Sequence, residues 1–366
     1  MDTFAFIIHP IDPKRDVSRK FPLLGRLLNE RQIDFFSTFF PPVFISEIEG
    51  IVSQATGKQI KGWFIACPYT PRRMIELPEH TVYRKLIQTG RLAERLGAQI
   101  LGLGAYTSVI GDAGVTIAKA LEVPVTTGDS YTVMIAVEAI REAARVMDVP
   151  LSGATAAVVG AAGAIGQVCA ELLAEDVERL YLIGRRQEAL EELRARLSIR
   201  ASAELIVSTS MDVLADAQLI LTVTSALHDV IRPRHLQPGS VVCDVARPRD
   251  VSAMVAAARD DILVIDGGMV DVPGPVNFHF NFGFPPGKAY ACMAETIALA
   301  LEGRFEDYTL GKHLTRARVE EISAMAKKHG FRLSGFRSFE RELTQQQIET
   351  VRRNAKMVRH LRTARI

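Results

Sequence analysis

One stretch in the middle of the chain limits the fold more than any other. The stretch "ATAAVVGAAGAIGQVCAELLAE", residues 154–175, is apolar over Ala156–Val159, breaks into glycines, and then takes on helical spacing. This order predicts a buried strand, a tight turn and a helix. The glycines Gly160, Gly163 and Gly166 fall as G-x-x-G-x-x-G. Such spacing allows a sharp turn, lets a pyrophosphate approach the backbone and lets helix and strand pack closely.

Further apolar runs follow the glycine turn, with helix-like segments between several of them. The expected strands are Leu180–Ile183, Leu219–Val223, Val241–Asp244 and Leu263–Ile265. Alternating strands and helices predict an α/β fold with a doubly wound parallel sheet, a Rossmann domain over residues 151–270. The alternative is an α/β turn that binds no nucleotide, because glycine turns are common.

The residues after the second expected strand bear on the cofactor. An NAD-binding protein usually has an acidic residue there, but this chain has Gly184, Arg185 and Arg186. Guanidinium groups can pair with a 2′-phosphate, so we expect NADPH. The alternative is that both arginines begin a solvated helix face. The expected cofactor-binding residues are Gly160, Gly163, Ala164, Ile165, Gly166, Arg185, Arg186 and Thr224.

Residues 1–130 are expected to form an N-terminal α/β substrate domain, followed by a linking helix over 131–150. Strands at Ile100–Leu103 and Val123–Thr126 each lead into a polar loop, and these loops carry Ser108 and Asp129. Open α/β sheets form their sites at the carboxyl ends of strands, so Ser108 and Asp129 are candidate catalytic residues. For Asp129 the competing interpretation is a helix cap.

The remainder, residues 271–366, is expected to be a helical segment that carries the candidate nucleophile Cys292. The chain has four cysteines without CxxC spacing, which indicates free thiols rather than a disulfide framework. Residues from Lys288 onward are expected to be helical, with Cys292 within two turns of the helix start. The helix dipole, together with Lys288 four residues before the thiol, is expected to lower the pKa of Cys292. The alternative is a cysteine that fills the core.

Composition excludes some broad classes. The net charge is +2, with 44 basic and 42 acidic residues, so nothing favours a nucleic-acid partner. The N-terminus is expected to be a strand rather than a signal peptide, and no apolar run is long enough to span a membrane. We expect a cytoplasmic protein without a metal site, and the oligomeric state stays open.

The basic tail "LTQQQIETVRRNAKMVRHLRTARI" has small or apolar residues at Ile348, Val351, Ala355 and Val358. Their spacing predicts an amphipathic helix. It is expected either to pack on its own domain or to offer a basic surface to an acyl carrier or an anionic membrane.

Several blocks resemble one family. They are "ATGKQIKGWFIACPYTPRRM", "LGLGAYTSVI", "VPVTTGDSYTV", "GAAGAIG", "ILVIDGGMVD" and "YACMAETIALALEG". In these blocks the chain is similar to the aldehyde-forming long-chain acyl-acyl carrier protein reductases of cyanobacteria. The family usually has Asn where this chain has Asp129, and the segment "VPGPVNFHFNFGFPPGK" departs from the family pattern.

The resemblance implies that Cys292 accepts an acyl group from acyl carrier protein or coenzyme A, and that NADPH reduces the resulting thioester to an aldehyde. Two alternatives stay open. One is an NADP-dependent alcohol dehydrogenase of the shikimate dehydrogenase kind, although the chain lacks a clear N-V-T-x-P-x-K stretch. The other is a non-catalytic NADP(H)-binding regulator.

Overall fold

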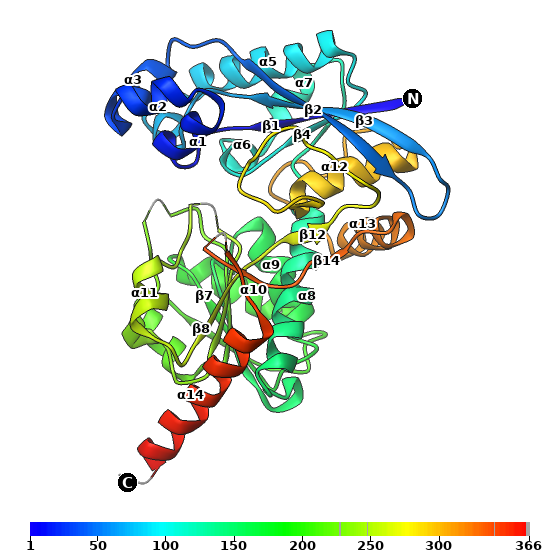
Figure 1. The fold of residues 1–366 in the computed structure, drawn as a ribbon. Coiled ribbons are helices and arrows are strands. Elements are labelled where there is room, and N and C mark those ends of the chain that lie inside the picture. The colour runs from blue at the N-terminus through cyan, green and yellow to red at the C-terminus, as the bar shows by residue number, and fades with distance from the viewer. Residues whose placement is uncertain (227, 247, 340, 364–366) are drawn as a thin grey trace. The chain divides into compact units, whose positions relative to one another are not determined.

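The structure is a computed structural model that describes residues 1–226, 228–246, 248–339 and 341–363 (Figure 1). The chain divides into two compact units, each made of two stretches of sequence. The first unit comprises Met1–Tyr131 and Val270–Arg332, and the second comprises Thr132–Met269 and Leu333–Ile366. The segment expected over 271–366 is therefore shared between the units, and it contains short strands as well as helices.

The first unit is built on a five-stranded sheet of order β2-β3-β1-β4-β5. Its strands are β1 (Asp2–Ile8), β2 (Val43–Val52), β3 (Gln59–Ala66), β4 (Leu101–Leu103) and β5 (Val125–Thr126). β2 runs antiparallel to β3, and the other pairings are parallel. Apolar side chains from β1, β3, β4 and β5 form one core with the neighbouring helices, as expected for a sheet covered by helices.

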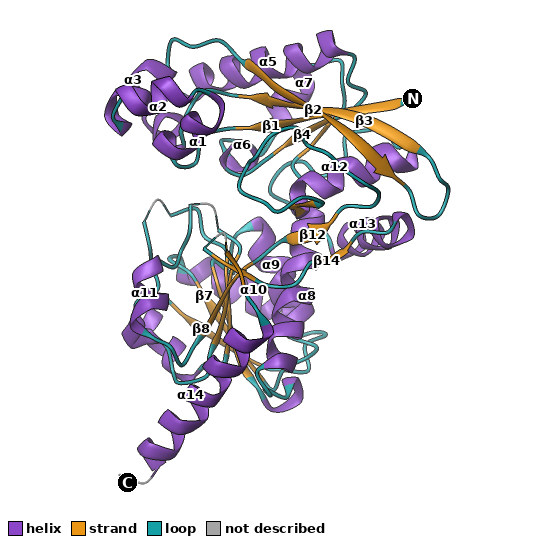
Figure 2. Cartoon of the chain, in the orientation of Figure 1, coloured by secondary structure: helices purple, strands orange, loops and turns teal. Residues whose placement is uncertain are grey.

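Helices of the first unit lie in the connections between its strands and in the segment Val270–Arg332, which returns to this unit late in the chain (Figure 2). They are α1 (Pro13–Lys20), α2 (Pro22–Leu27), α3 (Glu30–Ser37), α4 (Pro71–Glu76), α5 (Glu79–Leu96), α6 (Tyr106–Val109), α7 (Val115–Ala120), α12 (Ala291–Glu302) and α13 (Arg316–His329). α12 packs against β1 and β4, so the returning segment belongs to this sheet.

The second unit contains a six-stranded parallel sheet of order β11-β10-β9-β6-β7-β8. Its strands are β6 (Thr155–Val159), β7 (Arg179–Ile183), β8 (Glu204–Ser208), β9 (Leu219–Thr222), β10 (Val241–Asp244) and β11 (Leu263–Asp266). Numbered from β6, this is the order 6-5-4-1-2-3 of a doubly wound dinucleotide-binding sheet, which confirms the predicted fold class. Five of these strands were predicted within one residue of their bounds, and the prediction for β9 ran one residue too far. Strand β8 was not predicted from the sequence.

The remaining elements complete the two units. They are α8 (Asp129–Val146), α9 (Ala164–Leu173), α10 (Gln187–Leu197), α11 (Ala253–Ala258), α14 (Gln345–Thr363), β12 (Met269–Asp271), β13 (Lys288–Tyr290), β14 (Arg332–Leu333), β15 (Arg337–Ser338) and β16 (Arg341–Glu342). Within the described residues, no helix is both long and apolar enough to cross a membrane.

Candidate functional site

Three parallel strands of the first unit end at the same edge of the sheet, and each leads into a segment with chemically active side chains. β1 pairs with β4, and β4 pairs with β5, all in parallel register. The carboxyl ends of parallel strands lie together, which is where open α/β sheets place their sites. The segments that follow these three strands contain His9, Ala105–Ser108 and Thr127–Asp129.

Cys292 reaches this region at the start of α12. It is the second residue of the helix and is partly exposed, whereas Cys67, Cys169 and Cys243 are buried. The helix begins at Ala291, and Lys288 lies in β13 before it. The predicted helical relation between Lys288 and Cys292 is therefore wrong, because the two residues do not share a helix. Tyr290 precedes the helix without capping it through its side chain, so its first-turn N–H groups lack that partner.

Gly128 brings the loop after β5 into direct contact with Cys292. Its φ of 77° lies in the left-handed region that favours glycine. A Cβ added at Gly128 would stand 2.4 Å from Cys292 Cβ and 2.3 Å from its Cα. Only glycine fits here, so the backbone next to Asp129 lies against the backbone of Cys292.

Glu295 holds the same loop from the next turn of α12. Its side chain is fully buried, and its carboxyl accepts hydrogen bonds from Thr126 Oγ1 at 2.5 Å and from the Tyr131 N–H at 2.8 Å. These bonds fix both ends of the segment that contains Gly128 and Asp129. Glu295 was not among the predicted site residues; the available signal was an acidic residue three positions after Cys292 in an apolar helix.

The two groups at the centre of this site titrate far from their ordinary ranges. Burial, with the nearby charge of Glu295, raises the pKa of Asp129 to about 8. Burial, with the charge of Asp129, raises the pKa of Cys292 to about 12, although backbone hydrogen bonds from Ala105 and Met293 oppose this. The predicted acidification of the thiol is therefore wrong, because desolvation outweighs the helix terminus. Cys292 is a thiol in the protein alone and requires a base.

Ser108 is used by the local turn. Its hydroxyl donates to the Ala105 carbonyl at 2.8 Å, and Ala105 has a φ of 50°, which is unusual for a residue with a side chain. The adjacent Tyr106 N–H donates to His9 Nε2 at 3.0 Å. These bonds shape the loop whose backbone reaches Cys292, while the hydroxyl of Ser108 is already engaged. A catalytic role for Ser108 stays a prediction.

The glycine turn of the second unit has the features that a pyrophosphate requires. Gly160 has a φ of 86°, and a Cβ at Gly166 would stand 2.2 Å from the Gly160 carbonyl oxygen. Gly163 precedes α9 without a side-chain cap, and Ala164 and Ile165 begin that helix. No side chain therefore caps the start of α9, and its first backbone N–H groups can bind a phosphate.

Arg185 and Arg186 follow β7 directly, and both side chains are exposed. Neither makes an ion pair with any residue that the structure describes, so both guanidinium groups are available to an anion. Thr224 follows β9, where its N–H and hydroxyl donate to the buried carboxyl of Asp250 at 2.9 and 2.5 Å. Thr224 is thus held rigidly after the strand that neighbours β6.

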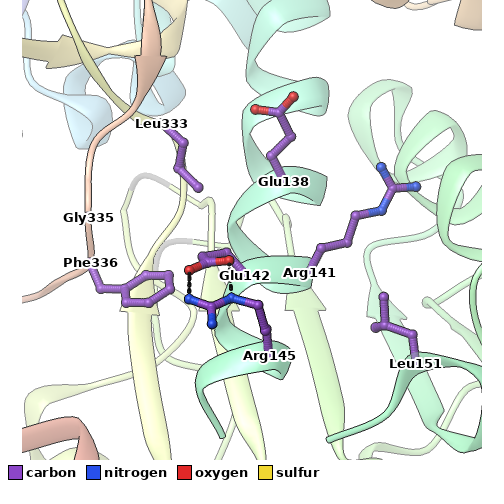
Figure 3. A pocket seen from close by; sticks show the side chains of 8 residues that line it. All are labelled: Glu138, Arg141, Glu142, Arg145, Leu151, Leu333, Gly335 and Phe336. Carbon is purple, nitrogen blue, oxygen red and sulfur yellow. Dashed lines mark hydrogen bonds and ion pairs between the residues drawn. The ribbon is translucent and has the colours of Figure 1, made fainter. Parts of the chain in front are cut away.

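An open depression of about 700 Å³ lies beside α8 in the second unit (Figure 3). Figure 3 shows that the charged side chains that line it come from α8, where Arg145 pairs with Glu142 at 2.5 Å. Its apolar lining comes from Leu151, Leu333 and Phe336. Neither Cys292 nor the glycine turn lines it, so the candidate site is not placed there.

The basic tail forms α14, as predicted. Ala355 is buried, and the cations of Arg352 and Lys356 pair with Asp148 at 3.2 and 3.0 Å. Arg359 donates to the Pro238 carbonyl at 2.9 Å. Part of its basic character is therefore used to attach the helix to its own unit, and its docking role stays a prediction.

Comparison with known proteins relates the chain to reductases. Residues 141–266 match the family described as Shikimate / quinate 5-dehydrogenase. The chain is 29% identical over 346 residues to the long-chain acyl-[acyl-carrier-protein] reductase of Synechococcus elongatus, covering 90% of this chain and 98% of that protein.

Two further similar proteins differ in how much of each chain is covered. The chain is 32% identical over 314 residues to the aminotransferase PigE of Serratia sp., covering 82% of this chain but only 36% of that protein. It therefore spans about a third of the length of that relative. The structure of L-tryptophan dehydrogenase from Nostoc punctiforme aligns with a TM-score of 0.42 at 12% identity, covering 97% of this chain and 87% of that one. The chain thus carries an oxidoreductase-type NAD(P)-binding fold and has a family-level relation to the acyl-[acyl-carrier-protein] reductase.

Proposed function

We propose that the protein reduces an acyl thioester to an aldehyde with NADPH, through an acyl group held on Cys292. The observation that carries this proposal is the position of Cys292: a residue that is partly exposed although its thiol is desolvated, at the first turn of a helix and packed on Gly128 beside Asp129. A structural cysteine would instead be buried among apolar side chains, as Cys169 is. The similarity to an acyl-[acyl-carrier-protein] reductase supports the same chemistry.

Acylation requires the thiol to lose its proton. Asp129 is the candidate base, because its charge acts directly on the thiol, and with a pKa of about 8 it is partly ionised near neutral pH. The proton moves from Cys292 Sγ to the Asp129 carboxylate while the sulfur attacks the thioester carbonyl carbon. The carbonyl oxygen becomes an oxyanion, which the first-turn N–H groups of α12 can stabilise. The carrier thiolate then leaves and takes up a proton, which gives an acyl-enzyme.

The second step returns the thiol. NADPH, when bound, supplies the hydride that reduces the carbonyl carbon of the acyl-enzyme. The tetrahedral oxyanion gains from the same N–H groups, and its collapse releases the aldehyde and the Cys292 thiolate. Asp129 then returns the proton to the sulfur. The overall change consumes one thioester, one NADPH and one proton, and it yields an aldehyde, a free carrier thiol and NADP⁺.

The cofactor part of the proposal rests on the second unit. The close approach of Gly166 to the Gly160 carbonyl leaves no room for a side chain at Gly166, so the turn stays tight, which fits a pyrophosphate. Arg185 and Arg186 are exposed and make no ion pair with a described residue, which fits a 2′-phosphate. No acidic side chain occupies the position that would hold a 2′-hydroxyl.

A row of aromatic rings that ends near Cys292 supports a substrate with an apolar acyl group. Ring centroids follow one another from Phe64 to Phe282 at 5.1 Å, from Phe282 to Phe284 at 5.3 Å, and from Phe284 to Tyr290 at 4.3 Å. The row ends two residues before Cys292, and Phe282, Phe284 and Tyr290 are partly exposed. Adjacent rings offer a surface on which a hydrocarbon chain can lie. We therefore propose a long-chain acyl group on a carrier protein as the substrate.

The proposal is tested by incubating the full chain with NADPH and a long-chain acyl carrier protein, and by measuring aldehyde together with NADPH oxidation. We expect one aldehyde per NADPH oxidised, and no activity in Cys292→Ala. Cys169→Ala is the matched control, because it removes a thiol from the second unit and should retain turnover. Aldehyde formation by Cys292→Ala would contradict the proposal.

A further inference from the structure

Helices α2 and α3 of the first unit present large apolar side chains to solvent. Leu23 and Leu27 of α2 are 72% and 77% exposed, and Phe35, Phe36 and Phe39 in and after α3 are 53%, 43% and 71% exposed. We call these five side chains the Leu/Phe face. Both helices pack against α1. Scattered apolar residues are normal on a surface, but several large ones on neighbouring helices mark an interaction site.

The structure holds this face outward. α3 buries Ile33 and Ser37 on its inner side, so its phenylalanines lie on the side that is exposed to solvent. The helix starts with a capping box between Asn29 and Gln32, which fixes its first turn. Phe35 contacts Phe36 and Phe39 edge-on, with ring centroids 5.4 and 5.6 Å apart.

Contacts with the rest of the first unit anchor the end of this segment. Lys85 of α5 donates to the Phe40 carbonyl at 2.7 Å. Arg73 of α4 donates from its Nε to the Asp34 carbonyl at 3.3 Å. The face is therefore a feature of the folded unit and not a loose segment.

Cations accompany the apolar side chains. Lys14 of α1, Arg26 of α2 and Arg31 of α3 are exposed, and none forms an ion pair with a residue that the structure describes. Asp34 is already engaged by Arg73 at 3.8 Å, which leaves Glu30 as the exposed carboxyl beside them in α3. Positive charge therefore exceeds negative charge among the exposed groups of these three helices.

We infer that the Leu/Phe face docks onto an anionic lipid bilayer. Leucine and phenylalanine side chains that stand out into solvent insert into the headgroup region, while neighbouring arginines pair with anionic headgroups. A protein partner would need a matching pocket for each protruding ring, whereas a bilayer adapts to them. The inference concerns a surface outside the proposed reaction and does not rest on it.

The test is co-sedimentation of the full chain with vesicles of phosphatidylcholine mixed equally with phosphatidylglycerol. The variant that replaces Phe35 and Phe39 with serine should lower the partition coefficient about tenfold or more, because two apolar anchors are lost. The matched control replaces Ile199 and Met254 with serine, since these side chains are 81% and 77% exposed in the second unit. It should bind like the unmodified protein, and circular dichroism should show both variants folded.

Charge gives a second readout. Replacing Arg26 and Arg31 with glutamine should weaken binding to the mixed vesicles more than binding to phosphatidylcholine alone, and salt should reduce that difference. The inference is overturned if the unmodified protein does not sediment with the vesicles, or if the phenylalanine variant still binds as well as the control. It is also overturned if the phenylalanine variant changes only self-association, which would assign the face to a second copy of the chain.

Discussion

The glycine turn of the second unit and the Cys292 site of the first unit are assembled in opposite ways. The turn is built from consecutive residues between β6 and α9, and only backbone contacts hold it, including hydrogen bonds from the N–H groups of Gly160 and Ala161 to the Ile183 carbonyl of the neighbouring strand. The Cys292 site collects residues from after β1, β4 and β5 and from α12, which lies more than 150 residues further along the chain. The first kind of site is defined largely by one short stretch of sequence, whereas the second depends on side chains from distant segments.

Exchanging one glycine in each region should separate the two sites most strongly. Gly128→Ala places a Cβ within 2.4 Å of Cys292 Cβ at a φ of 77°, so α12 has to shift, and we expect acylation to fall about a thousandfold while NADPH binding persists. In Gly166→Ala the added Cβ would stand 2.2 Å from the Gly160 carbonyl oxygen. We expect this variant to lose NADPH binding while acylation of Cys292 persists. Calorimetric titration measures the affinity for NADPH, and rapid-quench experiments measure the acylation rate. A loss of both functions in both variants would contradict the separation.

Asp129→Asn should lower the acylation rate about 100-fold, within the range usual for loss of a general base. In the unmodified protein the rate should rise with pH and level off near 8, because raising the pH removes the proton that Asp129 holds at its raised pKa. In the variant that plateau should disappear, and the rate should keep rising as the thiol itself ionises. An unchanged pH profile would remove Asp129 from the proton transfer.

Arg185→Ala and Arg186→Ala together should remove most of the preference for NADPH over NADH. Each charge-assisted contact with the 2′-phosphate contributes about 1.5–3 kcal/mol, so each arginine should account for a factor of about ten or more. Acylation of Cys292 in the absence of cofactor should keep its rate, because neither arginine takes part in that step. Equal affinity for the two cofactors in the unmodified protein would contradict the prediction.

Phe284→Ala should have the smallest effect, and the effect should depend on chain length. Loss of one partly exposed ring should reduce kcat/KM for a long acyl thioester about fivefold, while a short acyl thioester should be reduced little, because it cannot reach the ring. Phe44→Ala is the matched control, since Phe44 is 41% exposed in the same unit and lies outside the row of aromatic rings. An equal reduction for long and short substrates would mean that Phe284 only supports the fold.

The same contrast explains what the sequence could predict. The doubly wound sheet was predictable because strand, glycine turn and helix follow one another, and each has a local pattern. The place of Cys292 near a helix start was predictable from the local sequence, while its role as the nucleophile stays a prediction. The pKa of its thiol was not, because burial against Gly128 and the charge of Asp129 come from segments that the sequence does not show to be neighbours. Glu295 was missed for the same reason, since its partners Thr126 and Tyr131 are distant in sequence.

The most direct test of the account is the intact mass of the protein after incubation with a long-chain acyl thioester in the absence of NADPH. We predict a mass increase of one acyl group in the unmodified protein, none in Cys292→Ala, and a full increase in Cys169→Ala and in the arginine variant. Addition of NADPH should then remove the added mass and release the aldehyde. An acyl adduct that persists in Cys292→Ala, or aldehyde release by a protein that never carries an adduct, would contradict the account.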